Sequence, residues 1–148
     1  MEVGRNLKVL FKRLHKDAIV PTYAFDGDAC CDLYSVEGVI LTSMERQLIC
    51  TGIAIQIPPG FEAQIRSRSG LSLRQGLVMV NGVGTIDSQY RGELKLPMIN
   101  LSDDVVKINK GDRIAQMKFS PVYTGYFLEV DNLEVTNRGV GGFGHTGR

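Results

Sequence analysis

The stretch Gly52-Ile53-Ala54-Ile55-Gln56-Ile57 decides the fold class of this 148-residue chain. Isoleucines stand at every second position, and Pro58-Pro59-Gly60 follows them directly. Alternating β-branched residues are typical of a strand, and a Pro-Pro-Gly sequence is typical of a turn. The stretch therefore predicts a β-strand that ends at a turn.

The rest of the chain follows the same plan, because seventeen glycines and five prolines divide it into short apolar runs. Short apolar runs separated by glycine and proline are typical of an all-β protein. We predict strands at residues 8–14, 39–41, 47–57, 62–66, 78–80, 94–100, 105–108 and 113–121. A helix of one or two turns is expected only at residues 69–75, near a serine cap. The strand number favours a jelly roll or related sandwich, and it leaves a barrel open.

Length and composition limit the organisation and the partners of the protein. The length predicts a single domain, residues 1–148, with a β core at 1–137 and a mobile glycine-rich arm at 138–148. Seventeen Lys and Arg against sixteen Asp and Glu leave a net charge of +1, which opposes a nucleic-acid partner. The absence of a long apolar stretch opposes a membrane partner or export. Cys30, Cys31 and Cys50 lack the spacing of disulfide or zinc frameworks, so we expect reduced thiols in the cytoplasm.

The segment Arg68-Ser69-Gly70 opens the predicted helix and follows the strand that ends at Arg66. Helix-start amides, a hydroxyl and a guanidinium converge there, and such groups together bind anions. A phosphate site is one hypothesis. A serine N-cap flanked by two solvated arginines explains the same residues equally well.

A glycine-spaced turn, Gly82-Val83-Gly84-Thr85-Ile86-Asp87, follows Asn81 and ends on a carboxylate. Beside apolar Ile86, the carboxylate of Asp87 has the chemistry of a general base that activates water. Backbone amides near Asn81 suit a flat heterocycle, and the ring of Tyr90 suits a sugar or a base. A plain β-hairpin with a turn aspartate and a core tyrosine is the alternative interpretation.

Two polar side chains occur within apolar runs. Gln116 ends the segment Gly111-Asp112-Arg113-Ile114-Ala115-Gln116 and needs a polar partner if it faces inward, whereas Asp112 and Arg113 have the option of pairing across the turn. Asp32 lies in the apolar run 28–35, where a buried carboxylate needs an arginine, amides or metal-bound water. Magnesium held mainly by substrate phosphates suits such a carboxylate.

The glycine-rich tail, residues 138–148, contains one aromatic ring and several hydrogen-bond donors. Such an arm can bend closely over a polyphosphate, with Arg138, His145 and Thr146 as donors and Phe143 stacking on a base. A disordered terminus is the alternative. The single Phe among glycines favours the functional interpretation, because a purely solvated tail has no use for an exposed ring.

In this order the five segments resemble the five motifs of the trimeric dUTP pyrophosphatase (dUTPase) family, over about residues 28–148. The most specific matches are Arg68-Ser69-Gly70-Leu71, Gly84-Thr85-Ile86-Asp87 with Tyr90-Arg91-Gly92, Gly111-Asp112-Arg113-Ile114-Ala115-Gln116, and Gly141-Gly142-Phe143-Gly144. The resemblance implies a jelly-roll-like (β-clip) fold and a homotrimer with shared active sites. It also implies hydrolysis of dUTP to dUMP and pyrophosphate with Mg2+ as cofactor, which limits uracil in DNA and supplies dUMP for thymidylate synthesis.

The resemblance also implies roles for individual residues. Asp87 corresponds to the general base for the water that attacks the α-phosphorus, and Asp32 to the carboxylate that supports magnesium through water. Tyr90 corresponds to the ring that packs on deoxyribose and excludes a 2′-hydroxyl, and Phe143 to the ring that closes over uracil. The remaining substrate contacts are the phosphate ligands Arg68, Ser69, Gly70 and Gln116, the uracil-reading Asn81 with the backbone near Thr85, Ile86 and Lys95, and the tail residues Arg138, Gly144, His145 and Thr146.

Four residues depart from the usual motifs, and two other functions compete with the hydrolase. The departures are Cys30, Cys31, Ser67 and Gln89. A non-catalytic nucleotide-binding module on the same fold is one alternative, although such a module would be expected to have lost a motif residue. A deoxycytidine triphosphate deaminase is the other, and the glycine-rich tail argues against it.

Overall fold

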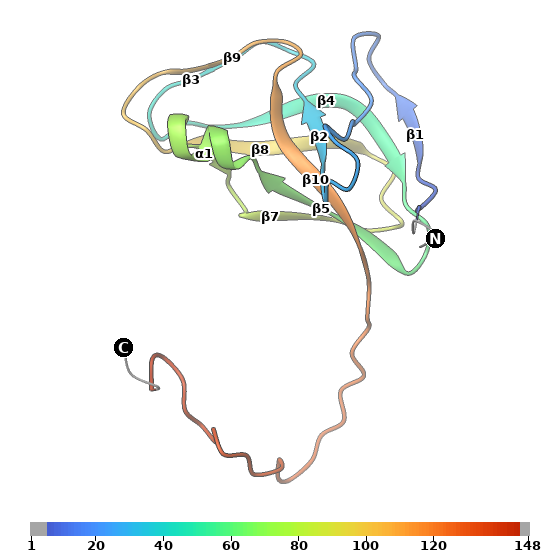
Figure 1. Ribbon diagram of the computed structural model, residues 1–148, viewed down its shortest axis with the longest axis vertical. Coiled ribbons are helices and arrows are strands. Elements are labelled where there is room, and N and C mark those ends of the chain that lie inside the picture. The colour runs from blue at the N-terminus through green and yellow to red at the C-terminus, as the bar shows by residue number, and fades with distance from the viewer. Residues whose placement is uncertain (1–5, 146–148) are drawn as a thin grey trace.

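The computed structural model describes residues 6–145 and is mostly β-sheet (Figure 1). These residues form ten strands and one short helix. In chain order the elements are β1 (Leu10–Arg13), β2 (Cys31–Tyr34), β3 (Val39–Leu41), β4 (Arg46–Gln56), β5 (Phe61–Ser67), α1 (Ser69–Gln75), β6 (Leu77–Met79), β7 (Val83–Ile86), β8 (Glu93–Asn100), β9 (Val106–Ile108) and β10 (Arg113–Pro121).

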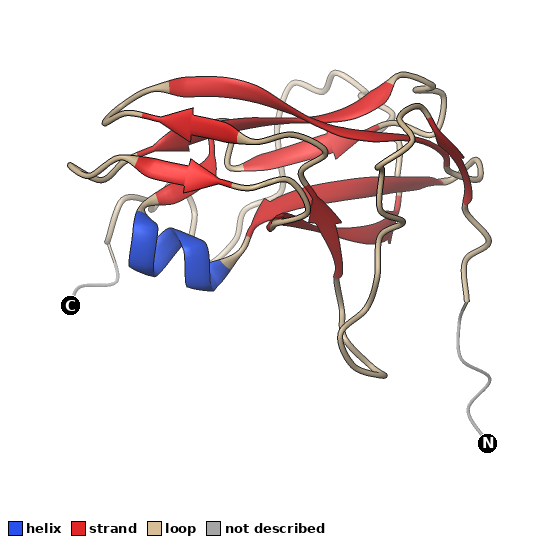
Figure 2. Ribbon diagram, turned by 90° about the horizontal axis from the view of Figure 1, so that it is seen from above, coloured by secondary structure: helices blue, strands red, loops and turns tan. Residues whose placement is uncertain are grey.

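The strands described here pair antiparallel in three sheets. One four-stranded sheet has the order β1-β4-β8-β6, the other has the order β2-β10-β5-β7, and β3 pairs with β9. The sheets form layers, and α1 lies outside them at one edge (Figure 2). The expected all-β fold with one short helix is therefore confirmed.

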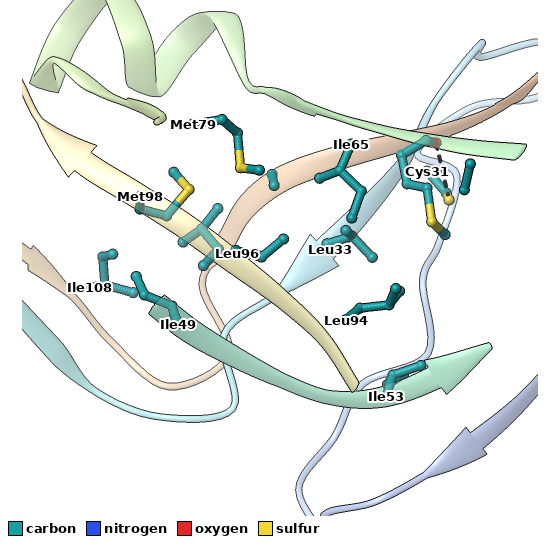
Figure 3. Packing of buried hydrophobic residues seen from close by; sticks show 14 of the residues in the cluster. Cys31, Leu33, Ile49, Ile53, Ile65, Met79, Leu94, Leu96, Met98 and Ile108 are labelled. Carbon is teal, nitrogen blue, oxygen red and sulfur yellow. Dashed lines mark hydrogen bonds between the residues drawn. The ribbon is translucent and has the colours of Figure 1, made fainter. Parts of the chain in front are cut away.

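The core fills the space between the two larger sheets (Figure 3). Leu94, Leu96 and Met98 alternate along β8 and are fully buried, and they meet Leu33 of β2 and Ile65 of β5 in one hydrophobic cluster. Full burial of one such side chain contributes about 1.5–3 kcal/mol. The period-two pattern of these strands thus sets which face of each sheet is turned inward.

Predicted and observed elements agree closely at β3, β10 and α1, and two strands were not among those predicted. The strand β7 was missed because Gly84 interrupts its apolar pattern. Gly84 is buried, and a Cβ built there would lie 3.6 Å from the Cβ of Ile65. The strand β2 was missed because it is short, with only Cys31 and Leu33 facing the core.

The expected serine cap of α1 is wrong. Arg68 occupies the N-cap position with an extended backbone, and its side chain makes no capping hydrogen bond. Ser69 is instead the first helical residue. The helix ends at Gly76, whose φ of 65° is left-handed, and a Cβ there would lie 2.8 Å from the amide nitrogen of Ser102. A residue other than glycine would therefore strain this end.

The C-terminal segment leaves the β body after β10 (Figure 1). The amide of Val122 donates to the carbonyl of Gly60 at 2.9 Å, and residues 122–145 contain neither helix nor strand. The last described strand therefore ends at Pro121. Among the described residues no strand pairs with the segment that follows, and its aromatic rings, such as Phe127 at 94% exposure, face solvent. Within the described range, no helix has the length and apolarity needed to cross a membrane.

Candidate active site

A cleft of about 460 Å³ gathers three of the motifs predicted from the sequence. We call it the arginine cleft. The segment 28–32, the start of α1 and the strand β10 surround it, and its polar lining includes Asp32, Arg68, Ser69, Gly70, Arg74, Arg113 and Gln116. The fold thus brings together Asp32, the Arg68-Ser69-Gly70 segment and Gln116, which lie far apart in the sequence.

Asp32 is the centre of the arginine cleft. Its Oδ1 lies 3.0 Å from Nε of Arg68, and its Oδ2 lies 3.2 Å from Nη1 of Arg113. The Asp32 side chain is 13% exposed, so the carboxylate is largely withdrawn from water and needs these partners. Nη1 of Arg68 also donates to the carbonyl of Arg113 at 3.0 Å. The carboxylate therefore holds both guanidinium groups in place.

Gln116 lines the same cleft, on the strand β10 that pairs with both β2 and β5. It lies opposite Asp32 on β2 and opposite Arg66 on β5. Its Nε2 donates to the carbonyl of Ser67 at 2.8 Å, which supplies the polar partner that its position requires. One N–H of this amide remains available to a ligand.

The turn before β10 differs from one sequence interpretation. Asp112 does not pair with Arg113. Its Oδ2 instead accepts a hydrogen bond from the amide of Asn109 at 2.7 Å. Sequence reasoning missed Arg113 as a site residue, because only the β2–β10 pairing reveals its proximity to Asp32.

A second cleft, of about 390 Å³, lies beside the connection from β6 to β7. The sequence suggests a hairpin there, but β6 pairs with β8 and β7 with β5, in different sheets. We keep the name hairpin cleft for this site. Its lining includes every hairpin residue expected at the site, namely Asn81, Thr85, Ile86, Asp87, Tyr90 and Lys95, together with Glu93. The fold therefore brings these residues to one cleft.

Asp87 and Glu93 are the two carboxylates of the hairpin cleft, and they differ in their contacts. Oε1 of Glu93 accepts from the amide of Gly52 at 2.8 Å, and Oε2 lies 3.8 Å from Nζ of Lys95. Asp87 is exposed, and its side chain has no hydrogen bond or ion pair with any described residue. Asp87 is thus the carboxylate that is free to act on a ligand or water.

The ring of Tyr90 is held in place from two sides. Its hydroxyl donates to the carbonyl of Glu93 at 3.0 Å, and its amide donates to the carbonyl of Asp87 at 3.0 Å. A Cβ on Gly92 would clash with the Tyr90 hydroxyl, so glycine is needed for the ring to lie there. Nη1 of Arg91 donates a hydrogen bond to the carbonyl of Ser88 at 2.6 Å, within the same loop.

The described tail residues, 138–145, form turns of their own and line neither cleft. The amide of Gly141 donates to the carbonyl of Arg138 at 3.1 Å, and the amide of His145 donates to the carbonyl of Gly142 at 3.1 Å. The ring of Phe143 is fully exposed. Gly144 lies in the same turn, and Thr146 lies outside the described residues. Within residues 6–145, this chain alone does not bring the tail to the other motifs.

The two clefts are also separate, because they share no lining residue. One chain therefore presents the Asp32 and Arg68 motifs on one surface and Asp87 on another.

The donors for a metal ion are few. Within residues 6–145, no three His, Cys, Asp or Glu side chains lie close enough to hold a metal by themselves. The thiol of Cys31 is buried in the core, where it donates to the carbonyl of Met117 at 3.4 Å, and Cys31 does not line the arginine cleft. Asp32 has one partner on each oxygen, which leaves lone pairs for metal-bound water.

Relatives of known activity match almost the whole chain. The dUTPase family model matches residues 16–147. The deoxyuridine 5′-triphosphate nucleotidohydrolase of Clostridium kluyveri is 52% identical over 141 residues, which cover 95% of this chain and 99% of that protein. The enzyme of the same description from Hydrogenobaculum sp. is 50% identical over 142 residues, with coverage of 95% and 99%.

Solved structures of phage enzymes have the same fold. The dUTPase of Staphylococcus bacteriophage 80alpha with dUPNHPP superimposes with a TM-score of 0.89 at 31% identity, over 95% of this chain and 99% of that chain. A variant of the dUTPase from S. aureus phage phi11, solved with a structural Mg(II) ion, has a TM-score of 0.80 at 27% identity and covers 86% of this chain and 99% of its own. On the family model and these identities, the chain belongs to the dUTPase family of deoxyuridine 5′-triphosphate nucleotidohydrolases.

Proposed function

We propose that the protein hydrolyses dUTP to dUMP and pyrophosphate, with Asp87 activating the water that attacks the α-phosphorus. The observation that carries this proposal is the free carboxylate of Asp87 in the hairpin cleft, beside a Glu93 that is already engaged. A carboxylate without a competing partner is able to accept a proton from water. The attack forms an oxygen–phosphorus bond, and the bond from the α-phosphorus to the bridging oxygen breaks as pyrophosphate leaves.

The hairpin cleft supplies the groups that select the nucleoside. The strand β7 is an edge strand of its sheet, so among the described residues its outer main-chain groups have no partner strand. Such an edge offers donors and acceptors to the polar edge of uracil, with Asn81, Thr85 and Ile86 beside it. Lys95 lines the same cleft. The ring of Tyr90 would pack on deoxyribose, where a 2′-hydroxyl would collide with it.

The arginine cleft supplies the phosphate contacts. Arg68, Ser69, Gly70 and Gln116 offer charged and neutral donors there, and guanidinium groups match phosphate oxygens well. We infer that Asp32 supports Mg2+ through water, since magnesium keeps waters and needs few carboxylates when phosphates coordinate it. The ion would neutralise charge on the phosphates.

The separation of the two clefts supports a homotrimer in which each active site combines residues of different chains. Tyr123, Tyr126 and Phe127 are each at least 90% exposed on the segment after β10. Exposed aromatic rings in such number indicate a protein partner. In the proposed trimer this segment crosses to a neighbour, and Arg138, Phe143, Gly144, His145 and Thr146 close the site over the substrate. Light scattering that shows a monomer at micromolar concentration would contradict this assembly.

The three cysteines are free, which supports a reducing, cytoplasmic location for the enzyme. There the reaction would keep uracil out of DNA and supply dUMP for thymidylate synthesis.

The variant Asp87→Asn tests the proposed reaction. We expect turnover of dUTP to fall by about 100-fold or more, because the general base is lost, while binding of dUTP remains. Asp103→Asn is the matched control, since Asp103 is an exposed aspartate outside both clefts. Release of pyrophosphate is measured with dUTP, dCTP, TTP and UTP, and release of ammonia with dCTP. Near-normal turnover of Asp87→Asn, or ammonia from dCTP, would overturn the proposal.

A further inference from the structure

The arginine cleft contains one cation whose charge is not offset. Arg68 and Arg113 both pair with the carboxylate of Asp32. Arg74 lines the same cleft, and within residues 6–145 it forms no ion pair or hydrogen bond with an acidic side chain. Of the three guanidinium groups, Arg74 is therefore the one that a new anion meets without competition.

The position of Arg74 results from helix geometry and from a glycine. Arg74 lies in the last turn of α1, and helical side chains point back toward the N-terminus of their helix. A Cβ built on Gly70, four residues earlier, would lie 2.8 Å from Nη2 and 3.5 Å from Cζ of Arg74. The guanidinium thus lies over Gly70, beside the predicted phosphate ligands Arg68 and Ser69. Any side chain at position 70 would push it away.

We propose that Arg74 is a further phosphate-binding residue, which contacts the triphosphate from the α1 side of the arginine cleft, and that Gly70 leaves the space it occupies. The inference rests on the proposed dUTP hydrolysis and deepens it. It separates two tasks among the arginines. Arg68 and Arg113 are ordered by Asp32 before substrate arrives, whereas Arg74 contributes a full positive charge to the incoming triphosphate.

The variants Arg74→Gln and Arg74→Lys test this role in the full-length protein. Loss of a charge-assisted contact should raise the KM for dUTP about tenfold in Arg74→Gln, with a smaller change in kcat. Inhibition by inorganic pyrophosphate should weaken in parallel, and Arg74→Lys should recover part of both. Gln and Arg have similar helix propensities, so the melting temperature should stay close to that of the wild type. Arg46→Gln, at an exposed position outside the arginine cleft, is the control for lost charge.

A double-mutant cycle with Gly70→Ala tests whether the methyl group at position 70 acts by displacing the guanidinium of Arg74. We expect Gly70→Ala to raise the KM for dUTP in the wild-type background and to have a smaller effect when Arg74 is already Gln. Unchanged KM and pyrophosphate inhibition in a folded Arg74→Gln protein would overturn the inference. If the wild type itself released no pyrophosphate from dUTP, the proposed function would fail instead.

Discussion

Asp32 and Arg68 form an ion pair, with 3.0 Å between Oδ1 and Nε, that joins β2 to the start of α1. Because the same carboxylate also holds Arg113, one acidic side chain orders two cations of the arginine cleft.

The variant Asp32→Ala should weaken both folding and substrate binding. Two guanidinium groups would lose their acceptor, and the free energy of unfolding should fall by about 1–3 kcal/mol. The KM for dUTP should rise at the same time, because Arg68 is no longer held toward the cleft. Urea denaturation and steady-state kinetics measure the two effects. Asp17→Ala is the control, since its ion pair with Lys110 is on the surface and should matter little. Unchanged KM and stability would contradict the ordering role of Asp32.

The variant Gly92→Ala should reduce discrimination between dUTP and UTP. The added methyl group would displace the ring of Tyr90 and break its bond to the carbonyl of Glu93. We expect the ratio of kcat/KM values for dUTP and UTP to fall about tenfold or more. Tyr90→Phe keeps the ring and loses only the hydroxyl, so its ratio should fall less. A ratio unchanged in Gly92→Ala would show that the ring does not depend on this glycine.

The stability of the fold should decrease at alkaline pH through Cys31. Burial raises the pKa of this thiol to about 11, above its ordinary value of 9.0. A folded-state pKa above the unfolded value contributes stability that is complete below pH 9 and is lost as pH rises toward 11. The free energy of unfolding, measured by denaturation at several pH values between 9 and 11, should therefore fall more steeply with pH in the wild type than in Cys31→Ala. Parallel curves would show that the thiol does not titrate in this way.

Deletion of residues 138–148 should leave a folded assembly and remove most activity. The deleted residues make no hydrogen bond to the β body in the part of the chain that the structure describes, so the melting temperature should not change. Activity should fall about tenfold or more, because the proposed lid over the substrate is lost. Circular dichroism and pyrophosphate release measure the two quantities. Wild-type kinetics after the deletion would refute the lid role of the tail.

Residue patterns predicted the fold class because strand alternation and turn residues are local signals. They placed β10 and α1 at their observed bounds, yet they missed β7. Its Gly84 packs against Ile65 of a neighbouring strand, and such a contact is invisible in a local pattern.

The residues of the candidate site also divide into those that a local pattern indicates and those whose position depends on the fold. Motif chemistry made Asp87, Tyr90 and Gln116 candidates beside other interpretations, and the resemblance to a family gave each its predicted role. Arg113 and Arg74 were missed, because their place in the cleft depends on strand register and on the path of a side chain along α1.

Because the arginine cleft and the hairpin cleft lie apart on one chain, a variant that is inactive in one cleft should complement a variant that is inactive in the other. An Asp87→Asn chain keeps its arginine cleft, and an Arg68→Ala chain keeps its hairpin. If each site takes one cleft from each of two neighbours, random co-assembly of the two variants restores about one site in four. A cell that carries both alleles would then retain an activity that neither allele encodes alone.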